Sequence, residues 1–171
     1  MSDASILVVY FSRSGTTRRL AKSIAARLNA DIEEICGYRN RSGPWGYLRS
    51  LMEAVRQRPA EIVPHGRDVT SYELVVIGTP VWAASVSTPV RAYLAENRQY
   101  LRQVAFFCSL GGRGSESAFA QMRALAGKVP LAELKVSRRD VRQGDEGQLV
   151  GEFVGKLEHS LAEIGAREWL C

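Results

Sequence analysis

Runs of consecutive apolar residues alternate with helical repeats along the chain. Continuous apolar runs are typical of strands that are buried on both faces, and they predict strands at 5–11, 73–78 and 104–108. A shorter and more polar run at 31–36 predicts a strand near an edge of the sheet. A fifth strand is expected at 132–137.

Helices are predicted where apolar residues recur at three- and four-residue spacing. These repeats fall at 20–28, 48–55, 90–94, 119–125 and 147–164. Thr88 is expected to cap the third helix, with Pro89 in its first turn, and Pro59 and Gly127 are expected to end the second and fourth helices. Such alternation of strands and helices predicts a mainly parallel sheet with helices on both faces.

Length and composition narrow the class of protein. The 171 residues contain no internal repeat, low-complexity tract or linker, so we expect a single domain over 1–171. A hydrophobic fraction of 46% excludes intrinsic disorder, and no segment approaches the ~18 uncharged apolar residues of a membrane span. The first strand is predicted to begin by about Ser5, so we expect no signal peptide. Cys36, Cys108 and Cys171 form neither a CxxC pair nor a metal-ligand spacing, and we expect a cytoplasmic protein.

The chain is basic, with a formal net charge of +5 and a pI of about 9.4. Arginines are densest within 37–58, where only Glu53 opposes them: Arg39, Arg41, Arg49, Arg56 and Arg58. This region is either an anion-binding surface or a solvated face. The remaining positive charge is spread along the chain, which favours a solvated face, and we expect no nucleic-acid partner.

Three loops follow the three most apolar strands, at 12–17, 79–87 and 109–115. In parallel sheets of this kind, ligands bind at the carboxyl ends of the strands, near the point where the strand order reverses. We therefore expect the three loops to converge on one site.

Four hydroxyl residues surround Gly15 in the first of these loops: Ser12, Ser14, Thr16 and Thr17. One such hydroxyl can cap the start of a helix. The same N–H groups and the helix dipole also favour a phosphate, to which short hydroxyls can donate. Four hydroxyls exceed what capping needs, so phosphate binding is favoured. The loop lacks the lysine of a P-loop and has one glycine where the dinucleotide fingerprint has three.

The pattern Ser12-x-Ser14-Gly15-x-Thr17 resembles the phosphate-binding loop of flavodoxins, which hold the phosphate of FMN with hydroxyls and amides. The stretch YELVVIGTPVWAASVSTPVRAYL resembles the third strand, flavin loop and third helix of flavodoxin-like quinone reductases and related flavodoxin-family proteins. The segment VAFFCSLGGRGSESAF occupies the place of their third loop. The resemblance implies an α/β fold with a flavodoxin-like, doubly wound, five-stranded parallel sheet of order 2-1-3-4-5 and FMN at the strand ends.

The resemblance also assigns residues to the FMN site. The phosphate is expected on Ser12, Ser14, Gly15, Thr16 and Thr17. The flavin ring is expected between Thr79, Pro80, Val81, Trp82 and Ala83 on one side and Ser109, Leu110, Gly111 and Gly112 on the other. Trp82 either packs on the flavin or plugs the core, and Arg13 either compensates phosphate charge or takes no part. No catalytic side chain and no metal site is assigned.

Two departures from electron-carrier flavodoxins bear on function. Those proteins usually have a tyrosine in the third loop and an acidic docking face, whereas this chain is basic and has no aromatic residue between Ser109 and Ala118. The resemblance therefore implies an FMN-binding oxidoreductase that passes electrons from a reduced donor to a small acceptor such as a quinone, for example an NAD(P)H-dependent enzyme. The alternative is a non-catalytic electron-transfer or regulatory module. Either has a small-molecule or protein redox partner.

The second loop also carries an expectation about redox chemistry. In electron-carrier flavodoxins a glycine of this loop can turn toward the flavin. Here Ala83 and Ala84 follow Trp82, and alanine pays roughly 1–2 kcal/mol in the left-handed region. We therefore expect the loop to avoid that turn and to suit two-electron chemistry.

Other residues have ordinary structural interpretations. Cys108 ends an apolar strand and is expected to be a small core residue rather than a nucleophile. His65 and His159 are expected on the surface. Trp45 and Tyr47 either form one wall of a pocket or anchor the helix that follows them.

Overall fold

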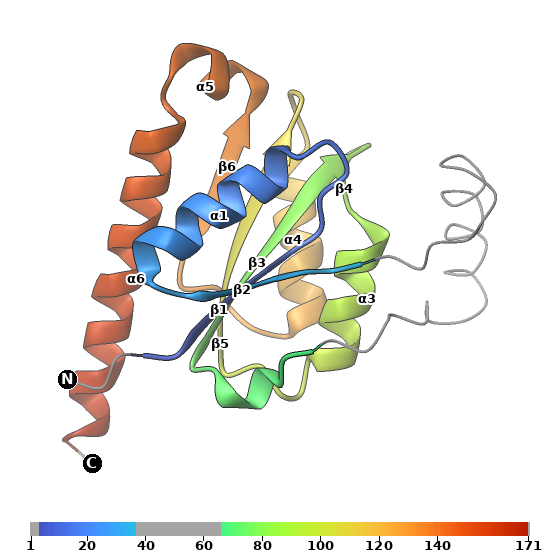
Figure 1. Cartoon of the computed structure of the whole chain (residues 1–171). Coiled ribbons are helices and arrows are strands. Elements are labelled where there is room, and N and C mark those ends of the chain that lie inside the picture. Colours follow the sequence, from blue (N-terminus) through green and yellow to red (C-terminus); the bar gives the residue numbers. More distant parts are fainter. Residues whose placement is uncertain (1–3, 37–65, 171) are drawn as a thin grey trace.

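A computed structural model describes residues 4–36 and 66–170 (Figure 1). Several sequence predictions lie outside these residues: the helix at 48–55 with its end at Pro59, the arginines of 37–58, Trp45, Tyr47, His65 and Cys171.

Within the described residues, five parallel strands form the sheet in the order β2-β1-β3-β5-β6, and a short strand, β4, pairs antiparallel with β3. Their bounds are β1 Ile6–Tyr10, β2 Asp31–Glu34, β3 Leu74–Trp82, β4 Ser85–Val86, β5 Gln103–Leu110 and β6 Glu133–Ser137. With the β4 hairpin set aside, this is the predicted order 2-1-3-4-5, and the fold class is confirmed. The polar strand β2 is at the sheet edge, as predicted.

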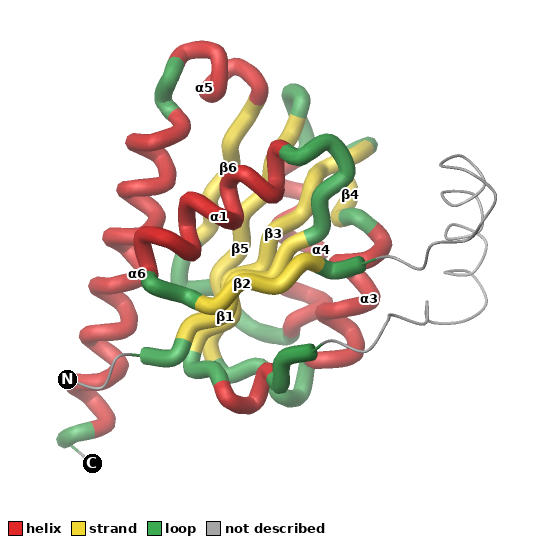
Figure 2. Tube along the Cα trace, in the orientation of Figure 1, coloured by secondary structure: helices red, strands yellow, loops and turns green. Residues whose placement is uncertain are grey.

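Helices cover both faces of the sheet (Figures 1 and 2). On one face lie α1 and α6, and on the other lie α3 and α4. The bounds are α1 Thr16–Leu28, α3 Thr88–Asn97, α4 Ser115–Ala126 and α6 Glu146–Glu168, with a short α5 at Arg138–Gln143 and a 3-10 turn, η1, at Val69–Ser71. Within the described ranges, no helix combines the length and the apolar character that crossing a membrane requires.

The continuous apolar runs are explained by burial of the strands on both sides. Along β1, Leu7 and Val9 face the core under α3 and α4, whereas Ile6 and Val8 face the core under α1 and α6. A strand with one exposed face alternates apolar and polar residues. These strands do not, because each must supply apolar side chains to two cores.

Strand β3 continues beyond its predicted end at residue 78, because Thr79 and Pro80 still pair with β5 and because β4 folds back and pairs with Val81 and Trp82. The hairpin turn consists of Ala83 and Ala84, whose φ angles are 49° and 58°. The expectation that these alanines avoid the left-handed region is therefore wrong. A two-residue hairpin matches the twist of its strands when both turn residues have positive φ, and the pairing of β4 imposes that geometry.

Two helix starts differ from the sequence predictions. The N-cap of α3 is Ser87, in extended conformation, and Thr88 is the first helical residue, so the predicted cap is one residue too late. Pro89 is in the first turn as predicted.

Helix α5 was not predicted. Its start is a capping box in which Ser137 and Asp140 each accept a backbone N–H of the other.

Candidate functional site

The loops that follow β1, β3 and β5 lie at the same end of the sheet, at the carboxyl ends of these strands (Figure 2). A hydrogen bond joins the first and third loops, because the hydroxyl oxygens of Thr17 and Ser109 are 2.7 Å apart although the residues are 92 positions apart. Both side chains are buried. The structure thus brings two of the predicted FMN residues into direct contact.

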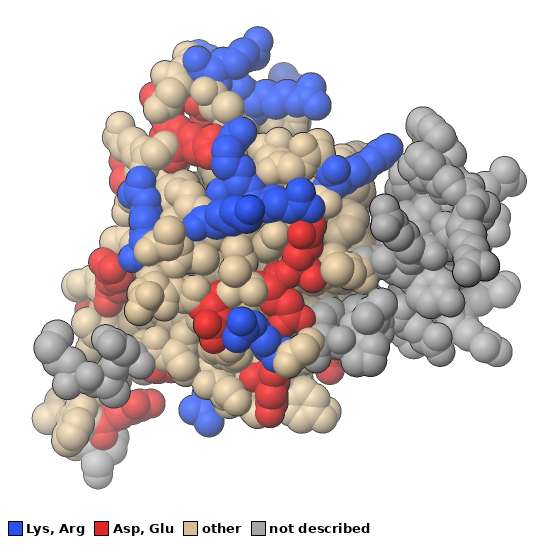
Figure 3. All heavy atoms as spheres, in the orientation of Figure 1, with Lys and Arg blue, Asp and Glu red and all other residues tan. Residues whose placement is uncertain are grey.

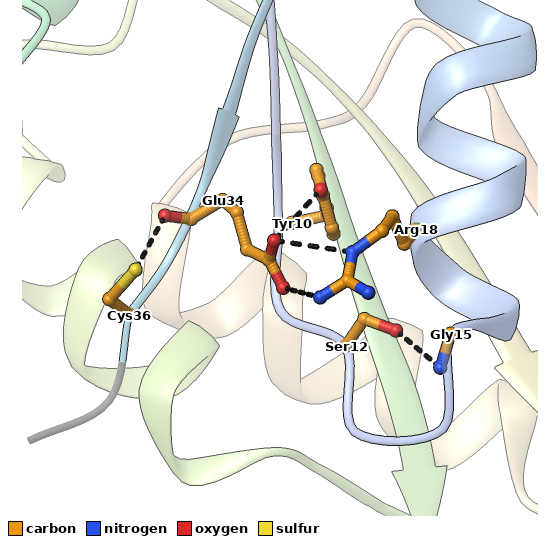
Figure 4. A network of polar contacts seen from close by, with 6 residues as sticks. All are labelled: Tyr10, Ser12, Gly15, Arg18, Glu34 and Cys36. Carbon is orange, nitrogen blue, oxygen red and sulfur yellow. Dashed lines mark hydrogen bonds and ion pairs between the residues drawn. The ribbon is translucent and has the colours of Figure 1, made fainter. Parts of the chain in front are cut away.

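Helix α1 begins at the first loop with a glycine as its N-cap. Gly15 has a φ of 91°, which glycine adopts readily, and its N–H donates to Ser12 Oγ at 3.1 Å (Figure 4). No side-chain cap and no acidic residue is found in the first turn of this helix, which lies wholly in the described part of the chain. The capping interpretation of the hydroxyl cluster therefore gains no support. Ser14 is exposed and Thr16 half-buried, so both are available at the surface.

A polar network fixes the first turn of α1 against β2 (Figure 4). Arg18 forms a two-pronged ion pair with Glu34, with its Nη2 2.6 Å from Oε1 and its Nε 3.3 Å from Oε2. Tyr10 donates its hydroxyl to the same carboxylate at 3.2 Å, and burial is the main cause that raises the pKa of Tyr10. The thiol of Cys36 lies 3.8 Å from the Glu34 carbonyl oxygen. The charge of Arg18 is thus matched by Glu34.

The second loop is held by a buried hydroxyl pair. Thr79 Oγ1 accepts the backbone N–H of Ser87 at 3.1 Å and lies 3.0 Å from Ser87 Oγ. Pro80 and Val81 are buried as well. Of the predicted second-loop residues, Trp82 and Ala83 are the two that are exposed, so they are the ones able to face a ligand from this loop.

Trp82 is 37% exposed and is not a plug of the core. Phe11 packs edge-on against its ring, with 6.2 Å between ring centroids and perpendicular planes. The guanidinium of Arg13 lies 5.8 Å from the Trp82 ring centroid, within the range of a cation–π interaction. Arg13 therefore connects the first loop to the second.

In the third loop, Ser109 and Leu110 are buried, whereas Gly111 and Gly112 are exposed. A Cβ atom on Gly111 would lie 4.0 Å from Nε of Arg138, so a guanidinium from the start of α5 borders this loop. Arg138 was not among the residues predicted for the site. Its position directly after a strand, at the same edge as the other loops, was the signal that could have found it.

Gly114 shows why the third loop can approach the hairpin. Its φ is 105°, and a Cβ atom there would lie 2.6 Å from Cα of Ala84. Both conditions require glycine. The second and third loops are therefore packed backbone to backbone beside the site.

Two predictions about reactive groups are confirmed. Cys108 is fully buried, and this burial raises the pKa of its thiol to about 12, so it is a core residue and not a nucleophile. His159 is exposed on α6 and lies 3.5 Å from Glu163. The three loops thus present hydroxyls, helix N–H groups, arginines and a tryptophan, a set suited to binding an anionic aromatic ligand.

The family model that matches this chain and three solved structures that resemble it describe flavodoxins or flavoproteins. A family model described as flavodoxin matches residues 5–146. A flavoprotein from Lactobacillus acidophilus NCFM, solved in complex with FMN, is 20% identical over 82% of this chain and 97% of that one, with a TM-score of 0.67. A Fusobacterium nucleatum flavodoxin bound to flavin mononucleotide is 8% identical over 92% and 98%, with a TM-score of 0.58. A WrbA-like flavodoxin from Agrobacterium tumefaciens is 14% identical over 86% and 96%, with a TM-score of 0.53. Curated proteins give no match.

Proposed function

The chain belongs to the flavodoxin family, and we propose that it binds FMN at the carboxyl edge of its sheet and passes electrons from a reduced donor to a small acceptor such as a quinone. The observation that carries this proposal is the start of α1: a helix N-terminus with a glycine cap and no side-chain cap, inside a loop of four hydroxyls. When bound, FMN supplies the redox chemistry, and the protein supplies orientation and electrostatics.

The donor set of the first loop fits a phosphate. Ser12, Ser14, Gly15, Thr16 and Thr17 would hold it with hydroxyls and backbone N–H groups, at the positive end of the α1 dipole. The loop 12–17 has no carboxylate that would repel an anion. Thr17 would contribute its backbone N–H, because its side chain is buried and its hydroxyl is already hydrogen-bonded to Ser109.

The second and third loops fit a flat aromatic ring. Trp82 and Ala83 would border the ring from one side, and the exposed backbone of Gly111 and Gly112 would border it from the other. Thr79, Pro80, Val81, Ser109 and Leu110 are buried behind these residues and would support them rather than cover the ring. An exposed tryptophan held by Phe11 and Arg13 offers a ring already oriented for stacking.

The second candidate function is a non-catalytic electron-transfer or regulatory module with the same FMN site. It is favoured by the side chains of the three loops, which include no group that titrates near neutral pH. NADH and NADPH distinguish the two functions. A reductase is bleached by one of them and recovers its colour with a quinone, whereas a module needs a protein partner. The cytoplasmic location remains a prediction from the cysteines.

Replacement of Ser14 and Thr16 by alanine tests the phosphate site. Both side chains reach the surface, and neither supports the loop contact that Thr17 makes. We expect FMN affinity to fall by roughly tenfold or more, equal to about 1.4 kcal/mol, while riboflavin affinity stays the same. Quenching of flavin fluorescence measures both affinities.

The matched control replaces Ser71 and Ser160 by alanine, which removes two hydroxyls from η1 and α6, outside the three predicted binding segments. It should change neither affinity. If the variant of Ser14 and Thr16 lost FMN and riboflavin equally, the first loop would not be the phosphate site.

A further inference from the structure

Exposed arginines border the candidate site along the carboxyl edge of the sheet. We call them the basic edge: Arg13, Arg113, Arg138, Arg139 and Arg142. Arg13 is in the first loop, Arg113 in the third, and the others in α5. In Figure 3, Lys and Arg side chains gather over α5 and α1 on the face shown. The basic edge thus borders a site at which Trp82 is exposed.

The charge of the basic edge is not matched by ion pairs. None of its arginines forms an ion pair with another described residue, whereas Arg18 and Arg19 of α1 are paired with Glu34 and Glu146. The three loops contain arginines but no Asp or Glu. The edge therefore has cations free to meet an external anionic group.

Acidic residues also lie near this edge, and two of them, Glu116 and Asp145, are exposed. Glu116 is in the first turn of α4, and Asp145 precedes α6. Asp140 lies within α5, but hydrogen bonds from Ser137 occupy its carboxylate and lower its pKa. The positive charge of the edge is therefore reduced but not cancelled.

The spread of the arginines decides which class of ligand they fit. Arg13 follows β1 and the α5 arginines follow β6, three strand spacings away, which amounts to roughly 14 Å at about 4.8 Å a spacing. A single phosphate group is bound by side chains that converge on one point, and arginines this far apart do not converge on one. Arginines spread along an edge, with an exposed tryptophan between them, are instead typical of protein interfaces.

We propose that the basic edge docks an acidic redox protein over Trp82. This proposal rests on the FMN site of the proposed function, which both candidate functions share, and it supplies the protein partner that the electron-transfer module needs. Arg138 lies against Gly111 and brings one cation to the third loop itself. Complementary charge accelerates association and orients the partner, and its effect is screened by salt over a Debye length of about 10 Å at 0.1 M.

A pair of charge-reversal variants tests the docking surface. The edge variant changes Arg113, Arg139 and Arg142 to Glu, which leaves untouched the two arginines that contact candidate FMN residues, Arg13 and Arg138. The control variant changes Arg102, Lys128 and Lys156 to Glu. These residues lie before β5, after α4 and within α6, and the control alters net charge by the same amount. An acidic [2Fe–2S] ferredoxin serves as the probe, and a basic c-type cytochrome serves as its opposite.

Calorimetric titration of the FMN-loaded proteins measures binding at low and high salt. We expect the native protein to bind the ferredoxin and not the cytochrome, with affinity falling about tenfold or more between 20 and 300 mM salt. The edge variant should lose roughly tenfold in affinity or more, and the control variant less than threefold.

Three results would overturn the docking surface: equal loss of affinity in both variants, equal binding of both probes, or a native protein that holds FMN but does not bind the ferredoxin. Loss of NADPH binding in the edge variant, with ferredoxin binding intact, would overturn it as well and assign the arginines to a dinucleotide phosphate. Failure of the native protein to hold FMN is a separate result, which refutes the proposed function.

Discussion

At the scale of single residues, the two described cysteines differ in their exposure to solvent. Cys36 and Cys108 are both free thiols, but Cys36 is exposed and Cys108 is fully buried. Burial raises the pKa of the Cys108 thiol from an ordinary value of 9.0 to about 12. The thiol therefore keeps its proton at pH 8 to 9. We predict that iodoacetamide at pH 8 to 9 alkylates Cys36 in the folded protein and leaves Cys108 unmodified, as measured by peptide mass spectrometry.

Unfolding in urea provides the control, because it should expose Cys108 to the same reagent. The contribution of this thiol to stability is present below pH 9 and is lost as the pH rises toward 12, since the unfolded thiol ionises first. Alkylation of folded Cys108 at the rate of Cys36 would show that the thiol is accessible and would refute its assignment to the core.

At the residue scale, the sequence predicts chemical types better than contacts. The hydroxyls of the first loop, the tryptophan and the core cysteine were all visible in the sequence. That Thr17 would bond to Ser109, or that Arg13 would lie over Trp82, depends on loops brought together by the sheet. Arg138 was missed for the same reason, because its closeness to Gly111 follows from the adjacency of β5 and β6.

At the scale of elements, the β3–β4 hairpin stores backbone strain beside the site. Ala83 and Ala84 both have positive φ, at a cost of roughly 1–2 kcal/mol each. Ala83→Gly relieves that cost at one position but gives the unfolded chain more freedom, worth about 0.4–1 kcal/mol. We predict a net gain in unfolding free energy of roughly 0.5–1 kcal/mol, measured by urea denaturation.

Ala26→Gly is the matched control for this substitution. Ala26 is exposed on α1, where glycine should destabilise by roughly 0.5–1 kcal/mol. The sign of the two changes should therefore be opposite. A loss of stability from Ala83→Gly as large as that from Ala26→Gly would mean that the hairpin is not strained at this residue.

Helices and strands with apolar patterns that span several residues were predicted, and the shortest elements were not. Five parallel strands and four of their helices follow from apolar runs and helical spacing that span several residues. The two-residue β4 and the six-residue α5 are too short for any period to appear. Their formation depends on local chemistry: pairing of Val81 with Val86 in one case, and the Ser137–Asp140 capping box in the other.

At the scale of the whole molecule, one sheet separates two apolar cores and carries the site at its edge. The core under α3 and α4 contains Ile77 and Phe106, and the core under α1 and α6 contains Val76 and Phe107, so adjacent residues of the same strands serve both. If these strands came away from one core, the apolar side chains of the other core would be exposed as well. The described residues are therefore expected to unfold in one cooperative transition.

This coupling predicts how FMN affects the whole fold. The proposed phosphate site begins α1, which covers one core, whereas the Trp82 hairpin leads into α3, which covers the other. A ligand bound only by the folded protein at 100 times its Kd adds about 2.7 kcal/mol to the unfolding free energy. For a domain of this size we predict a rise in Tm of roughly 5–10 °C, with the same shift by circular dichroism and by tryptophan fluorescence.

Riboflavin at the same concentration should raise Tm less, because it lacks the phosphate that the first loop would bind. A shift seen by one probe alone would show that the two cores unfold separately, and equal shifts by FMN and riboflavin would show that the phosphate is not held.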